Sequence, residues 1–143
     1  LASECEILVL DEPASALDLR NQEVVLQLVR RLARQGLTVV FTTHNPQHAS
    51  FAADRVLLMY APQDFVYGET HQVMTDENLR RLYGVNLTNV QVEYHGRTFK
   101  TVVHIYGATE HVAAVYGHGS TTIGHERATN GCIVDVVGQP AGR

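Results

Sequence analysis

Two acidic residues stand side by side directly after a short apolar run of the sequence. The run covers residues 6–10 (EILVL), and Asp11 and Glu12 follow it. Such a run is typical of a strand buried on both faces of a parallel sheet. Neighbouring carboxylates with little water around them repel each other, so they require a cation or hydrogen-bond donors. A magnesium ion could neutralise one of them while the other orients or deprotonates a water molecule.

A histidine follows the next apolar run. Residues 38–43 (TVVFTT) favour a second buried strand, and His44 comes directly after it. Ligands of open α/β sheets bind outside the carboxyl ends of the strands, where a neutral imidazole could contact a phosphate group or hold a water. The simpler alternatives are a helix-capping acid at the first strand end and an ordinary, satisfied strand-end histidine at the second.

The elements that must position these residues alternate between strands and helices. Ser15-Ala16-Leu17-Asp18 matches the [ST]-x-x-[DE] signature of a helix start and predicts a capping box, in which both side chains cap the helix. The sequence predicts helices over about 18–35, 46–52 and 75–84, and further strands over 55–59 and 65–67. Such alternation indicates a parallel sheet with right-handed crossovers.

The pattern changes in the second half of the chain. Residues 90–94 and 98–106 alternate as strands do and predict a hairpin, whereas the pattern weakens beyond Gly107 and residues 138–143 are expected to be disordered. Four histidines recur every seven residues, at His104, His111, His118 and His125. Histidine is a common metal ligand. Intervening glycines break any helix that would align the four, so coincidence is the favoured interpretation.

Composition narrows the function classes. The chain has 143 residues, enough for one ordinary domain, and 45% of them are hydrophobic. Its formal charge of −4 argues against a nucleic-acid-binding face. Cys5 and Cys132 are the two cysteines and form no CxxC pair, which argues against a disulfide framework or a cysteine zinc site and suits a reducing compartment.

Two motifs together resemble those of a known family. The stretch EILVLDEPASALD (residues 6–18) resembles the Walker B motif and D-loop of ABC-transporter ATPases, and Thr43-His44-Asn45 resembles their H-loop. Residues 53–59 and 68–85 resemble the strand, hairpin and helix that follow, most closely in importers of iron–siderophore, cobalamin and oxyanion (molybdate or tungstate) type.

The resemblance divides the chain into two parts. It covers residues 1–88, which it identifies as the C-terminal portion of a nucleotide-binding domain, and it leaves residues 89–143 as a C-terminal extension of unknown role. The fold class that it implies is α/β. A partial P-loop NTPase-like sheet, with parallel strands and crossover helices, is expected to precede a β-rich extension.

The resemblance also implies roles for individual residues. Asp11 would hold Mg²⁺, Glu12 would polarise the attacking water, and His44 would contact the γ-phosphate of ATP. Residues from Ser15 to Asp18 would form the D-loop, which reaches across a nucleotide-sandwich dimer. Glu12 and His44 are then the catalytic residues, and Asp11, Ser15, Asp18 and His44 the residues that bind ATP and Mg²⁺.

The implied partners are those of a membrane importer. The chain would pair with a second ATPase subunit as a homodimer and drive integral membrane permease subunits. It would serve a periplasmic or extracellular substrate-binding protein indirectly and would bind no nucleic acid. Its place would be peripheral, on the cytoplasmic face of the plasma (inner) membrane, and the cargo a metal chelate, cobalamin or an oxyanion.

Three family motifs that normally precede the Walker B strand do not occur. The sequence contains no G-x-x-x-x-G-K-[ST], no Q-loop and no LSGGQ-type signature, and it opens at Leu1 without a methionine. We therefore expect a fragment truncated at Leu1 that neither binds ATP tightly nor hydrolyses it alone. The alternative is a non-catalytic remnant that acts as a dimerisation or regulatory module, with a tail that binds a small ligand or metal.

Overall fold

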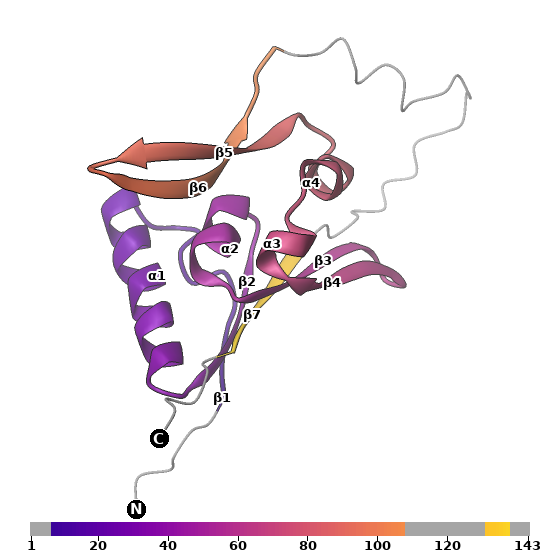
Figure 1. The fold of residues 1–143 in the computed structure, drawn as a ribbon. Helices are drawn as coiled ribbons and strands as arrows, with labels where there is room; N and C mark the ends of the chain where they lie inside the picture. Colours follow the sequence, from indigo (N-terminus) through magenta and orange to yellow (C-terminus); the bar gives the residue numbers. More distant parts are fainter. Residues whose placement is uncertain (1–6, 108–130, 138–143) are drawn as a thin grey trace, which may run out of the picture.

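A five-stranded sheet and a separate hairpin organise the computed structural model, which describes residues 7–107 and 131–137 (Figure 1). The order across the sheet is β1 (Ile7–Leu10), β2 (Thr38–Thr43), β7 (Gly131–Val137), β3 (Arg55–Ala61) and β4 (Asp64–Glu69). The hairpin joins β5 (Leu87–Tyr94) to β6 (Arg97–His104), so its first strand begins before residue 89. The α/β class expected from the sequence is confirmed.

The strand directions agree with the predicted parallel sheet for β1, β2 and β3, but not for β7. β1 and β2 are parallel neighbours, with Leu10 opposite Phe41. β7 is antiparallel to both β2 and β3, so β1, β2 and β3 still share one direction. The sequence analysis predicted no strand over residues 131–137, and this segment is therefore an addition to the predicted sheet.

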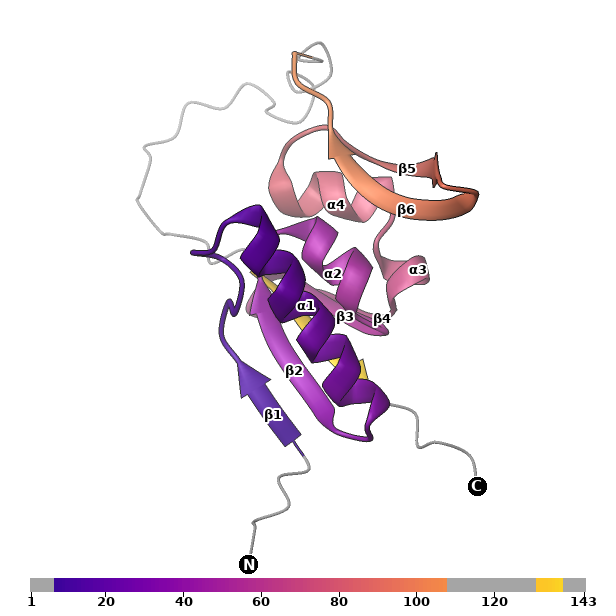
Figure 2. The same cartoon turned by 90° about the vertical axis from the view of Figure 1, so that its left-hand side faces the viewer.

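Four helices cover one side of the sheet (Figure 2). They are α1 (Leu19–Arg34), α2 (Pro46–Ala52), α3 (Thr70–Val73) and α4 (Asp76–Tyr83). Three of the four were predicted within a few residues, and α3 was not. Among the described residues, no helix is long and apolar enough to cross a lipid bilayer.

The start of α1 differs from the predicted capping box. Asp18 itself is the N-cap, and its carboxylate accepts a hydrogen bond from the Asn21 backbone N–H at 2.8 Å. The Ser15 hydroxyl instead donates to the Glu12 carbonyl at 3.1 Å. The predicted reciprocal cap is wrong because residues 12–17 turn twice before the helix begins, which separates Ser15 from the first helical turn.

The core lies between the sheet and the helices. Alternate residues of β2 and β3 point into it and are almost completely buried: Val39, Phe41, Val56 and Leu58. Residues of all four helices pack against them: Leu26, Val29, Ala33, Ala49, Ala52, Val73, Leu79 and Leu82. Because residues alternate between the faces of a strand, this packing fixes which side chains reach the opposite face.

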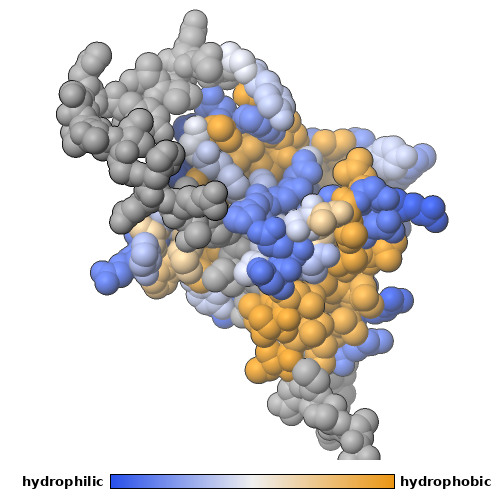
Figure 3. Space-filling view, turned by 180° about the vertical axis from the view of Figure 1, so that it is seen from behind, coloured by the Kyte–Doolittle hydropathy of each residue, from blue (hydrophilic) through white to orange (hydrophobic). Residues whose placement is uncertain are grey.

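The opposite face of the sheet remains open. Ile7 and Val9 on β1 are 59% and 71% exposed, and Phe65 and Tyr67 on β4 are exposed as well. Seen from behind, the surface on this side carries a broad hydrophobic region (Figure 3). The same alternation that buries Val39 and Phe41 therefore leaves an apolar sheet surface outside the core.

Candidate functional site

The parallel register of β1 and β2 brings Asp11 next to Thr42. Leu10 and Phe41 are paired across the two strands, and Asp11 and Thr42 are the residues that follow them. The Thr42 hydroxyl donates a hydrogen bond to Asp11 Oδ1 at 2.5 Å. Its oxygen, Thr42 Oγ1, also accepts a hydrogen bond from the Glu12 backbone N–H at 3.0 Å. One hydroxyl thus holds both acidic residues at the strand end.

Glu12 and His44 meet across the two strand ends. Glu12 Oε1 lies 2.5 Å from His44 Nε2, and the His44 side chain is 64% exposed. Glu12 has a φ of 44°, in the left-handed region that side-chain-bearing residues rarely adopt. Backbone strain of this kind persists only where the surroundings enforce it. Here the N–H and hydroxyl of Ser15 both donate to the Glu12 carbonyl.

The loop that contains His44 is fixed from two sides. The Tyr83 hydroxyl, at the end of α4, donates to the His44 carbonyl at 3.0 Å. Thr43 Oγ1 accepts a hydrogen bond from the Asn45 backbone N–H at 3.1 Å, and the Asn45 side chain caps α2. The His44 backbone is therefore held while its imidazole stays accessible.

Some of the predicted site residues lie together in the structure, and others do not. Asp11, Glu12 and His44 lie together at the ends of β1 and β2. Ser15 reaches this group through the Glu12 carbonyl. Asp18 makes its hydrogen bonds within α1, where Asn21 donates to both of its carboxylate oxygens.

The acidic residues offer ligands that suit Mg²⁺, which prefers carboxylate oxygens and keeps several waters of its own. Asp11 is exposed and can accept such an ion. In residues 7–107 and 131–137, no cluster of three or more His, Cys, Asp or Glu side chains could form a complete metal cage. Asp11 therefore fits an ion whose other ligands are water and phosphate. His111, His118 and His125 lie outside the described residues.

His48 is a buried polar residue near His44 that the sequence analysis missed. It lies on α2 with only 7% of its surface exposed, and burial lowers its pKa. A signal was present in the sequence. His48 stands four residues before Ala52, so both lie on the same face of a helix whose other buried residue is Ala49. A histidine in the middle of an apolar helix face requires polar partners.

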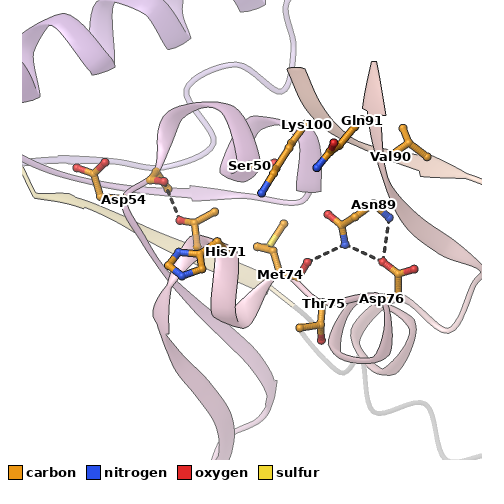
Figure 4. A pocket seen from close by; sticks show the side chains of 12 residues that line it. Ser50, Asp54, His71, Met74, Thr75, Asp76, Asn89, Val90, Gln91 and Lys100 are labelled. Atoms are coloured by element: carbon orange, nitrogen blue, oxygen red, sulfur yellow. Dashed lines mark hydrogen bonds between the residues drawn. The ribbon is translucent and has the colours of Figure 1, made fainter. Parts of the chain in front are cut away.

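A cavity of about 640 Å³ lies elsewhere, between α2, α3, α4 and the hairpin (Figure 4). Lys100 and His71 line it together with Asp54 and Asp76. The Thr88 hydroxyl and two N–H groups of Asn89 donate to the Asp76 carboxylate and lower its pKa. Acidic and basic side chains therefore both line the cavity.

Comparisons with known proteins agree with this geometry. A family model described as "AAA domain, putative AbiEii toxin, Type IV TA system" matches residues 1–48. The molybdate import ATP-binding protein of Haemophilus influenzae is 44% identical over 107 residues, which are 74% of this chain and 42% of that protein. A vitamin B12 import ATP-binding protein of Photobacterium profundum is 38% identical over 66% of this chain and 37% of its own length.

A solved structure shows the same relationship. It is described as "An inward-facing conformation of a putative metal-chelate type ABC transporter", and it matches 73% of this chain and 41% of its own chain with 43% identity and a TM-score of 0.69. The homologues of this chain are therefore ATP-binding subunits of ABC transporters. The chain spans less than half the length of these relatives, and this coverage fits a C-terminal part of such a subunit.

Proposed function

We propose that the chain provides the hydrolytic residues of the ATP-binding subunit of an ABC importer. The observation that supports this most directly is the contact between the Glu12 carboxylate and the His44 imidazole. It places a potential general base beside a histidine at the carboxyl ends of two parallel strands, where ligands of α/β sheets bind. ATP and Mg²⁺ are the cofactors of this proposal.

Each residue has a distinct role in the proposed reaction. Glu12 accepts a proton from the attacking water, because Thr42 holds its backbone at the strand end and His44 contacts its carboxylate. The Nε2–H of His44 donates a hydrogen bond to Glu12 Oε1, which orients the carboxylate, and the exposed imidazole can also contact the γ-phosphate. Asp11, fixed by Thr42, would hold Mg²⁺, which would supply positive charge to neutralise the phosphates. Ser15 to Asp18 form the loop that reaches the second subunit.

The names of the relatives support a proposal for the cargo and partners. Two of them are named as import ATP-binding proteins for molybdate and vitamin B12, and the solved neighbour is described as a putative metal-chelate type ABC transporter. We therefore propose uptake of an oxyanion, cobalamin or metal chelate, driven through permease subunits at the cytoplasmic face of the membrane. Residues 1–88 form the ATPase portion, and residues 89–143 add an extension whose strand β7 pairs with β2 and β3.

A chimera tests the proposal because the chain covers less than half of its relatives. The matching region of the Haemophilus influenzae molybdate import protein is replaced by the aligned part of this chain. We expect the chimera to hydrolyse ATP and Glu12→Gln to lower kcat by roughly 10²–10⁴, the usual contribution of a general base. Glu23→Gln, an exposed substitution on α1, is the matched control. Equal kcat values for the two variants would refute the role of Glu12.

A further inference from the structure

Two polar side chains are buried in the described part of the chain, and they contact each other. Thr43 and His48 are 6% and 7% exposed, and Thr43 Oγ1 lies 3.3 Å from His48 Nδ1. Thr43 directly precedes His44, and His48 lies four residues after His44, on α2. Burying a polar pair carries a free-energy cost unless its hydrogen bonds are made, so this pair calls for an explanation.

The other ring nitrogen of His48 faces two different partners. His48 Nε2 lies 3.2 Å from Asn45 Nδ2 and 3.4 Å from Gln22 Oε1. Separate hydrogen bonds fix the orientations of both amides: Asn45 Oδ1 accepts from the Gln47 backbone N–H, and Gln22 Nε2 donates to the Leu17 carbonyl. Nε2 is thus approached by one donor, from Asn45, and by one acceptor, from Gln22.

A neutral imidazole can satisfy only one of these two partners at a time. With the proton on Nε2, the ring donates to Gln22 while Nδ1 accepts from the Thr43 hydroxyl. With the proton on Nδ1, the ring donates to Thr43 while Nε2 accepts from Asn45. Burial lowers the pKa of His48, so the neutral ring and its choice between tautomers persist at neutral pH.

We propose that His48 is a positioning residue that couples the loop containing His44 to the loop of residues 15–18. The Nε2–H tautomer completes a path from Thr43 through His48 and Gln22 to the Leu17 carbonyl. The Nδ1–H tautomer breaks the path at Gln22 and ties the ring to Asn45 instead. This inference rests on the proposed function, because the two loops are those assigned to the γ-phosphate and to the second subunit.

The path can be tested in the 143-residue chain without any ligand. Long-range ¹H–¹⁵N NMR spectra report which ring nitrogen of His48 is protonated. Asn45→Asp keeps the cap oxygen of α2 and removes the donor, so it should shift the population several-fold towards Nε2–H. Gln22→Ala removes the acceptor and should shift it several-fold towards Nδ1–H. Gln27→Ala, an exposed change on the same helix that breaks a hydrogen bond to Glu23, should leave it unchanged.

Coupling between the loops has its own readout. Asn45 contacts Nε2 of His48, the nitrogen that also faces Gln22, and Gln22 in turn donates to the Leu17 carbonyl. If the coupling runs along this path, Asn45→Asp should change the Leu17 and Asp18 amide signals. We expect that change to disappear when Asn45→Asp is combined with Gln22→Ala. If the two variants leave the tautomer ratio unaltered, or if the loop signals respond equally in both backgrounds, the proposal is wrong.

Activity of the chimera separates this inference from the proposed function. His48→Ala should lower kcat several-fold with an unchanged KM for ATP, and His48→Gln, whose amide can replace the Nε2 contacts, should restore part of it. If Glu12→Gln abolishes hydrolysis but the folded His48 variants match the parent, the function stands and the coupling fails. If the chimera is inactive, the NMR experiment still decides the coupling.

Discussion

The hydroxyl of Thr42 offers the sharpest test of how the strand ends are held. Thr42→Val keeps the shape of the side chain but removes the donor to Asp11 Oδ1 and the acceptor of the Glu12 N–H. A hydrogen bond to a charged group contributes about 1.5–3 kcal/mol and a neutral one about 1 kcal/mol. Because Asp11 is exposed and regains water, we expect the free energy of unfolding to fall by about 1–2 kcal/mol.

Urea unfolding followed by circular dichroism measures this loss. With a slope of roughly 2 kcal/mol/M, the expected loss moves the midpoint by roughly 0.5–1 M. Thr38→Val, on the same strand and the same face, is the control for the change from threonine to valine. Thr42→Ser, which keeps the hydroxyl, should recover most of the stability. If Thr42→Val and Thr38→Val unfold at the same urea concentration, the hydroxyl does not hold the two acidic residues.

Three further predictions concern other parts of the fold. Hydrogen bonds from Thr88 and Asn89 lower the pKa of Asp76, so this group stabilises the fold above its unfolded pKa of 3.8 and loses that effect as pH falls through its folded pKa. Asp76→Asn should therefore flatten the acid side of a plot of stability against pH. Gly84 ends α4 with a φ of 67°, so Gly84→Ala should cost about 1 kcal/mol in a thermal melt although nothing lies within 4 Å of the added carbon. Deleting residues 131–143 removes β7, so the inner edges of β2 and β3 lose their partner. We expect calorimetry to show no cooperative unfolding and light scattering to show aggregation.

Local patterns were sufficient to predict most of the elements. The apolar run before Asp11 is β1, and the β-branched run before His44 is β2. Both were predictable because the composition and periodicity of each run already indicated a strand with side chains facing a core. α3 has only four residues, too few for a periodic signal. The position of β7 depends on pairing with strands about ninety residues earlier in the chain, which no local pattern encodes.

The site shows the same division between local and long-range information. Asp11, Glu12 and His44 could be proposed as site residues from the sequence because their types and spacing form motifs. Thr42 and His48 gain their roles from register and packing: Thr42 lies beside Asp11 only when β1 and β2 pair in parallel. His48 meets Gln22 only when α1 and α2 pack together, and such contacts are absent from a linear pattern.

The place of β7 also sets the order in which the sheet can form during synthesis. β2 and β3 leave the ribosome early, but the strand that joins them is the last described segment to be made. At roughly 5–20 residues per second, the about 76 residues between Ala61 and Val137 take roughly 4–15 s to synthesise. During this interval the nascent chain exposes two unpaired strand edges, a period in which chaperone capture competes with misassociation.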